Sequence, residues 1–168
     1  MDETYREQLR HKFRFEEWAS PPAETARNGG SAEGFPVAGA QLGHWRAERG
    51  DPFSLPGAPS ASSSFWSGDG QDAEVLLRLE VMETASPSAA RELVLELLGE
   101  FQSPQVEREA NPTSGDLAFA VPGGTALLFT RGAVVAMIRN AGRRVVPVGE
   151  FARLVDERLA HGTGGSPG

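Results

Sequence analysis

The sequence contains no cysteine, a single lysine and no long apolar run, and these absences exclude several classes of protein. Without cysteine the chain forms no disulfide, no thiolate nucleophile, no cysteine-ligated zinc site and no iron–sulfur cluster. No stretch approaches the ~20 apolar residues that span a bilayer. The start, Met1 to Glu7, is acidic and lacks the apolar core of a signal peptide.

The balance of charge argues against a nucleic-acid partner. The 168 residues carry 16 basic and 23 acidic side chains, a formal net charge of −7. An acidic surface repels phosphate backbones. We therefore expect one domain in the cytoplasm, with neither membrane insertion nor a cofactor. A processed exported chain would have the same composition and stays an alternative.

The first part of the chain, residues 1–72, combines two signals that conflict. Glycine, proline and serine are abundant from Ala19 to Asp72, which is typical of disorder. Yet nine of the thirteen aromatic residues, including all three tryptophans, lie before Gln71. Disordered segments are poor in such residues. We expect this part to be irregular but docked, with an N-terminal helix carrying Tyr5, Leu9 and Phe13 and strands at 42–49 and 63–67.

The second part, residues 73–161, has regular periodicity that predicts an α+β core. Ala73–Glu83 alternates between apolar and polar residues, as a strand does. Ser86 and Pro87 then begin a helix over 87–101. Three short apolar runs separated by glycine turns predict an antiparallel meander, and Pro147 begins a closing helix. The fold class is thus an antiparallel sheet packed against two or three helices, in one domain over 1–161 with a flexible tail at 162–168.

The turns of the meander predict its register. A three-residue turn at 122–124 places Val121 opposite Thr125, and a two-residue turn at 131–132 places Phe129 opposite Val134. Both faces of the meander are then apolar, so both need a cover. We expect the two helices to cover one face and the aromatic first part or a partner to cover the other.

Four residues of the first part are candidates for a binding face. Nine large rings exceed what the second sheet face needs, so some should remain exposed in an apolar patch. We expect Trp45 or Trp66 at its edge, with His44 and Phe65 beside them. A metal site is not expected, because the three histidines His11, His44 and His161 are far apart in the sequence.

A second candidate site is a cluster of arginines. Between Asp116 and Glu150 there is no acidic residue, whereas four arginines occur there. Guanidinium groups bind carboxylate and phosphate in a bidentate manner, which makes Arg139, Arg143 and Arg144 candidates for an anion site. The fourth, Arg131, lies at the opposite end of the hairpin in the predicted register, beside Asp116, where the two form an ion pair.

Three functions from different classes fit these observations. The first is a non-catalytic binding or interaction module that recognises a protein partner, or a second copy of itself, through the aromatic face. The second is a small hydrolase or isomerase in which His44 and a carboxylate (Asp51, Asp69 or Asp116) share a pocket, although the sequence assigns no catalytic residue. The third is a sensor or accessory domain of an exported bacterial protein.

Overall fold

The computed structural model describes residues 2–18, 41–68, 73–100 and 105–161, which form an antiparallel sheet and its helices. The eight strands are ordered β1-β2-β3-β4-β8-β7-β6-β5, and every neighbouring pair is antiparallel. The predicted α+β class is confirmed. The elements are α1 (Glu3–Lys12), α2 (Phe15–Trp18), β1 (Gln41–Leu42), β2 (Trp45–Leu55), β3 (Ala58–Gly68), β4 (Leu77–Glu83), α3 (Pro87–Glu100), β5 (Glu107–Arg108), β6 (Leu117–Ala120), the 3₁₀ turn η2 (Pro122–Gly124), β7 (Ala126–Arg131), β8 (Val134–Asn140) and α4 (Gly149–His161).

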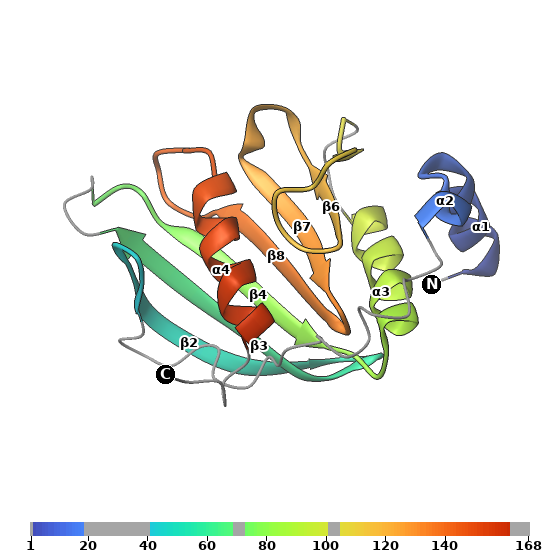
Figure 1. The fold of residues 1–168 in the computed structure, drawn as a ribbon, viewed down its shortest axis with the longest axis horizontal. Helices are drawn as coiled ribbons and strands as arrows, with labels where there is room; N and C mark the ends of the chain where they lie inside the picture. Colours follow the sequence, from blue (N-terminus) through green and yellow to red (C-terminus); the bar gives the residue numbers. More distant parts are fainter. Residues whose placement is uncertain (1, 19–40, 69–72, 101–104, 162–168) are drawn as a thin grey trace.

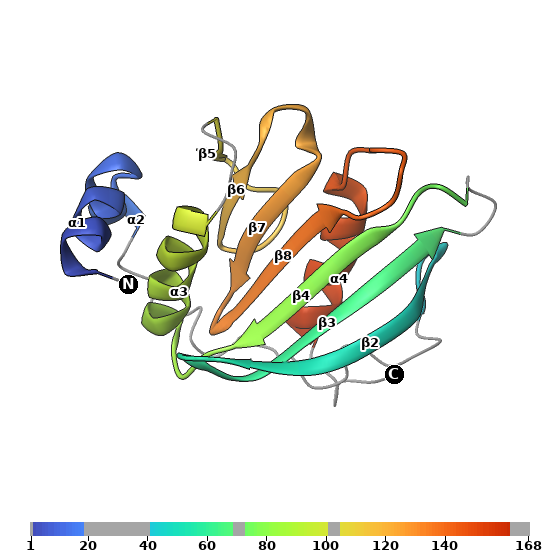
Figure 2. The same cartoon turned by 180° about the vertical axis from the view of Figure 1, so that it is seen from behind.

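The helices lie on opposite faces of the sheet, which corrects the prediction that both cover one face. In Figure 1, α4 crosses in front of β4 and β8; in Figure 2, seen from behind, the strands lie in front of α4. Helix α3 packs on the other face, and α1 and α2 lie beyond it. Because β7 and β8 carry buried apolar side chains on both faces, a helix on each face removes much of that apolar surface from water.

Strand β4 shows how the alternating sequence serves two cores. Leu77, Leu79 and Val81 are fully buried on the α4 side. Met82 is buried on the α3 side. Consecutive side chains of a strand point to opposite faces. The alternation therefore supplies one apolar surface to α4 and leaves Arg78 and Glu80 on the α3 side of the sheet.

The sequence located the two long helices and their starts well. Helix α3 begins after Ser86, whose Oγ accepts a hydrogen bond from the Ala89 N–H at 3.0 Å, as expected of an N-cap. The predicted N-terminal helix is also present as α1, capped by Asp2 through the Thr4 N–H at 3.2 Å. Helix α4 begins at Gly149, two residues beyond Pro147.

The described portion of the first part is more regular than predicted. Residues 41–68 form β1, β2 and β3, and the last two are eleven residues long. Pro52 lies in β2 next to the sheet edge, where a missing N–H donor is tolerated. Gly57 makes the connecting turn with φ +87°. Residues 19–40, 69–72 and 162–168, including the predicted tail and Asp69, lie outside the described residues.

The predicted register of the meander is wrong in two different ways. Ala120 pairs with Leu127, so the first turn contains one residue more than predicted, and the two faces of β6 are exchanged. The second turn is formed by Gly132 and Ala133 rather than by residues 131–132, and Arg131 pairs with Val134. That shift moves the pairing by two residues, which leaves each side chain of β7 and β8 on the face predicted for it.

The N-terminal helices pack against α3 through ion pairs and rings. Arg6 donates to Glu92 at 2.9 Å and also pairs with Glu96, so two glutamates of α3 bind another part of the same chain. Behind them, Trp18 makes an edge contact with Phe119 on β6 at a centroid distance of 5.3 Å. Helices α1 and α2 thus extend the α3-side core away from the centre of the sheet.

Candidate functional site

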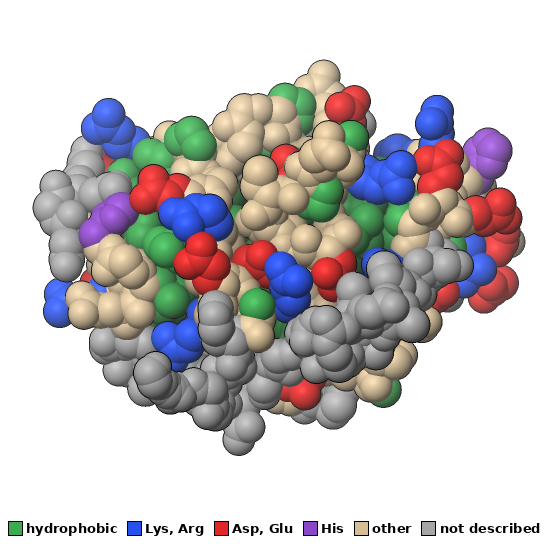
Figure 3. All heavy atoms as spheres, in the orientation of Figure 1, with side chains coloured by type: hydrophobic (Ala, Val, Ile, Leu, Met, Phe, Trp, Pro, Cys, Tyr) green, Lys and Arg blue, Asp and Glu red, His purple; other side chains and the backbone are tan. Residues whose placement is uncertain are grey.

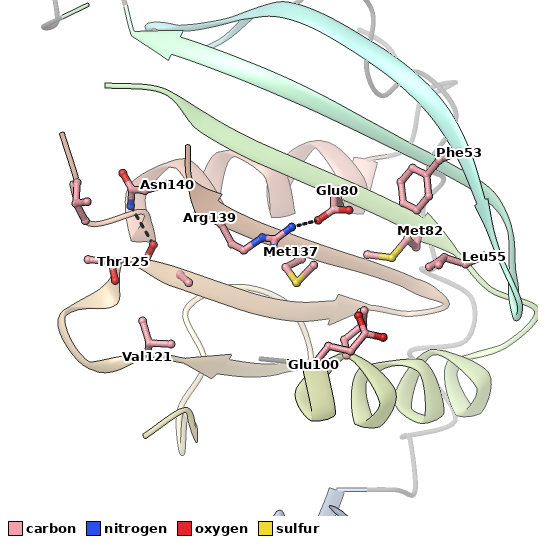
Figure 4. A pocket seen from close by; sticks show the side chains of 13 residues that line it. Phe53, Leu55, Glu80, Met82, Glu100, Val121, Thr125, Met137, Arg139 and Asn140 are labelled. Atoms are coloured by element: carbon pink, nitrogen blue, oxygen red, sulfur yellow. Dashed lines mark hydrogen bonds and ion pairs between the residues drawn. The ribbon is translucent and has the colours of Figure 1, made fainter. Parts of the chain in front are cut away.

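The α3 side of the sheet contains a groove of about 530 Å³. The groove lies between α3 and the part of the sheet that α3 does not cover. Figure 4 shows side chains from β2, β4, β7, β8 and α3 converging on this space. We call it the groove and define it by its thirteen lining residues. They are Phe53, Leu55, Glu80, Met82, Leu97, Glu100, Val121, Thr125, Ala126, Met137, Arg139, Asn140 and Val145.

One end of the groove is apolar. Met82 and Met137 are buried there on adjacent strands, and Phe53 and Leu55 of β2 are half-buried beside them. Leu97 contributes from the α3 side. Both methionines other than Met1 therefore belong to this surface. Methionine side chains are flexible and polarizable, and they adapt to ligands of different shape.

The other end of the groove is charged, with one carboxylate between two guanidinium groups. Glu80 accepts a hydrogen bond from Arg139 Nη2 at 2.7 Å and lies 3.6 Å from Arg78 Nη2. Arg78 and Arg139 are directly opposite each other on β4 and β8. The Arg78 Nε–H donates to Ser63 Oγ at 3.2 Å. The Glu80 side chain is 12% exposed and that of Arg139 is 42% exposed, so the positive group is the more accessible.

Asn140 fixes the wall at this end. Its Nδ2 donates to the carbonyl oxygens of Thr125 (3.0 Å) and Val146 (2.8 Å), and its Oδ1 accepts from the Val146 N–H at 3.0 Å. These bonds tie the segment that follows β8 to the turn before β7. Val145, in that segment, is 61% exposed beside the groove. The wall is therefore a braced loop that carries an exposed apolar side chain.

The two tryptophans predicted to border an exposed patch are in the core, so that expectation is wrong for both. Trp66 is fully buried and its Nε1–H donates to Ser64 Oγ at 2.7 Å, while Trp45 is 5% exposed. Each ring lies 5.3 Å from the ring of Phe151 on α4. They form the core between the sheet and α4, on the face opposite the groove.

Of the other two predicted binding residues, neither lines the groove. His44 stacks beside Trp45 at the β1–β2 turn, with ring centroids 5.2 Å apart. Phe65 is half-buried on the groove side of β3, where the Arg78 guanidinium lies 5.9 Å from its ring centroid. Phe65 is thus a neighbour of the charged end of the groove through Arg78.

The three arginines of the predicted anion site are separated in the structure. Arg139 lines the groove. Arg143 is exposed and lines a different hollow together with Glu48 and Ser67. Arg144 follows it and uses its backbone N–H to bind the Glu74 carbonyl oxygen at 3.0 Å. Only Arg139 therefore reaches the site that the structure shows.

Of the carboxylates suggested as catalytic partners of His44, two lie in the described part of the chain, Asp116 and Asp51. Asp116 accepts from the Gly132 N–H at 2.8 Å and lies 3.5 Å from Arg131, so the predicted pairing of Asp116 with Arg131 is confirmed. Asp51 is exposed on β2, opposite Ser63. Asp69 is outside the described residues.

Arg131 is at the centre of the most buried ion pair among the described residues. Asp156 of α4 receives two hydrogen bonds from it, each 2.8 Å long, and is 7% exposed. The hydrogen bond to Asp156 raises the pKa of Arg131 further above its ordinary value, against the opposing effect of burial. The pair fixes α4 to the end of β7 and belongs to the α4 face of the molecule.

Sequence reasoning missed the groove because its residues come from five separate elements. One signal was present: Glu80 stands between apolar neighbours in β4, and burial of a charge requires a partner. The pairing partner Arg139 lies on β8, and only the strand order places β8 beside β4. Within the described residues there is no cluster of three or more histidine or acidic side chains that could hold a metal ion.

The surface over α4 has a different character. In Figure 3, basic and acidic side chains are interspersed over this face, without a broad area of one sign. No helix of the described residues is long and apolar enough to cross a membrane. Comparison with protein-family models, curated proteins and solved structures gives no match for the chain.

Proposed function

We propose that the protein is a non-catalytic interaction module whose groove receives apolar side chains of a protein partner. One observation carries the proposal: the apolar end of the groove, with both core methionines, opens between α3 and the sheet. Its volume of about 530 Å³ is in the range of ligand sites, roughly 300–1,000 Å³. The opposite face is filled by Phe151 and the two tryptophans of β2 and β3, which leaves the groove side for recognition.

The composition of the groove favours a protein segment as its occupant. An open groove between a helix and a sheet admits the side chains of a peptide from the surface, in the manner of other apolar recognition grooves. Phe53, Leu55 and Val121 are half-buried around it and give an apolar rim. Removing apolar surface from water contributes about 25 cal/mol per Å², which supplies the driving force for such docking.

The experiment uses a neutral hexapeptide, acetylated and amidated, with two leucines at one end and glutamine at the other. Isothermal titration calorimetry measures its binding to the whole chain. Val145→Glu places a charge on the exposed wall of the groove and is expected to weaken binding at least tenfold. Ala160→Glu, an exposed change on α4, is the matched control and is expected to leave the affinity unchanged.

Absence of binding by the native chain at millimolar peptide would overturn the proposal. Equal weakening by both variants would also contradict it, because a change on α4 does not reach the groove. Native mass spectrometry distinguishes a protein partner from a second copy of this chain. A dimer that Val145→Glu abolishes would mean that a second copy fills the groove and would contradict the proposal.

A further inference from the structure

We infer that the partner segment carries a carboxylate, about four residues from its apolar anchor in an extended conformation, and that Arg139 binds this carboxylate. The inference rests on the proposed function and specifies the chemistry of the same site. It derives from the charges that line the groove and from their distance to the methionine floor.

The first step is the count of charges at the polar end. Arg78 and Arg139 share the single carboxylate of Glu80, which leaves one positive charge in excess. Among the described residues, Asp51 of β2 shares this sheet face but is exposed and does not line the groove, and Glu100 of α3 lines the groove on the side away from Arg139. A second carboxylate would balance the two guanidinium groups.

The second step concerns the hydrogen-bonding capacity of Arg139. A guanidinium has five N–H donors, and a carboxylate can accept two of them side by side. Within the described residues, Arg139 uses Nη2 to bind Glu80, and its side chain is 42% exposed. Figure 4 shows the Arg139 side chain among the groove-lining residues, and its remaining donors form no other hydrogen bond within the described residues, so they are accessible to a ligand in the groove. Arg78 has fewer donors to offer, since Ser63 and Glu80 both engage it.

The third step gives the groove a direction. Glu100 at the end of α3 also lines it, on the side away from Arg139. A carboxylate ligand is therefore repelled from the α3 side and attracted to the β8 side. The far end of the apolar floor is offset along the strands: Met82 pairs with Val135, Arg139 is four residues further along β8, and Met137 lies between these two positions. Four residues span about 14 Å in a strand.

This spacing defines the partner. An extended peptide covers the same 14 Å with about four residues, so an acidic side chain four residues beyond an apolar anchor reaches Arg139 while the anchor contacts Met82. The charge-assisted bond is half-exposed and is therefore of moderate strength. We expect it to raise affinity about twofold to fivefold over a neutral side chain of the same shape.

The test compares three hexapeptides that differ only in the residue four positions beyond the second leucine: glutamate, glutamine or lysine. Calorimetry at low salt measures each against the native chain. The expected order is glutamate tightest and lysine weakest, with the preference for glutamate reduced at 0.5 M salt by screening. In Arg139→Gln, the glutamate and glutamine peptides are expected to bind equally. Arg139→Lys, which keeps the charge but not the fork, restores part of the preference.

Arg143→Gln is the matched control, because it removes the same charge from an exposed arginine outside the groove. It is expected to keep the full preference for glutamate. Equal binding of all three peptides by the native chain would refute the carboxylate inference and leave the groove intact as an apolar site. Loss of the preference in both Arg139→Gln and Arg143→Gln would show only a long-range charge effect and would refute it as well. Failure of every peptide to bind would instead overturn the proposed function.

Discussion

Replacing Phe119 tests which face of the sheet strand β6 presents to α3. Phe119 is 1% exposed and makes edge contacts with Trp18 (5.3 Å between ring centroids) and Phe13 (6.0 Å). Phe119→Leu keeps an apolar side chain and removes both ring contacts. Two aromatic pairs at ~0.5–1.5 kcal/mol each give an expected loss of about 1–3 kcal/mol in the free energy of unfolding. Phe119→Ala would cost more, about 3–5 kcal/mol.

Urea unfolding measures the loss, and fluorine NMR of the chain labelled with 5-fluorotryptophan shows where it occurs. The three tryptophans give three signals, and we expect Phe119→Leu to shift that of Trp18. Phe151→Leu is the matched control, because Phe151 contacts Trp45 and Trp66 on the opposite face. If Phe119→Leu shifted the Trp66 signal and left that of Trp18 in place, the observed register of β6 would be refuted.

Two further stability predictions concern the Arg131–Asp156 ion pair and Gly142. Arg131→Met leaves the carboxylate of Asp156 buried without its partner and is expected to destabilise the fold by about 3–5 kcal/mol in urea unfolding. Arg153→Met, which breaks the exposed pair with Glu157 on α4, should lower the free energy of unfolding by less than about 0.5 kcal/mol. Similar losses of stability in both variants would contradict the difference in burial between the two ion pairs. Gly142→Ala would place a Cβ against the Glu74 carbonyl oxygen, and its thermal midpoint should fall by several degrees; an unchanged midpoint would show that the backbone there can move.

The outcome for the meander shows what local patterns can and cannot supply. The apolar runs of the sequence predicted β6, β7 and β8, because each buried strand is itself a short apolar segment bounded by turn residues. Register depends on a single turn residue: Thr125 belongs to the first turn, with φ −88° and ψ −7°, rather than to the strand. A threonine can occupy either a turn or a strand, so the sequence alone does not decide where Thr125 lies. That one residue exchanged the faces of β6, so Phe119 lies on the α3 side with Leu128 instead of on the face of Leu127 and Phe129.

The candidate site was less accessible to sequence reasoning than the fold. The excess of arginine over acid between Asp116 and Glu150 drew attention to Arg139. Its pairing with Glu80 follows from the position of β8 beside β4, a contact between residues far apart in the chain. The burial of Trp45 and Trp66 was not predicted for a related reason. Large aromatic rings occur both in cores and at binding surfaces, and these two are buried because both pack against Phe151 of α4.

Methyl NMR of the chain labelled at methionine tests the central claim, occupation of the groove, most directly. The sequence contains three methionines, of which Met82 and Met137 line the groove and report on its floor. Titration with the glutamate hexapeptide is predicted to shift the Met82 and Met137 signals together, with the same midpoint as calorimetry gives. Binding detected by calorimetry without a shift of either groove methionine would place the peptide elsewhere and contradict the account.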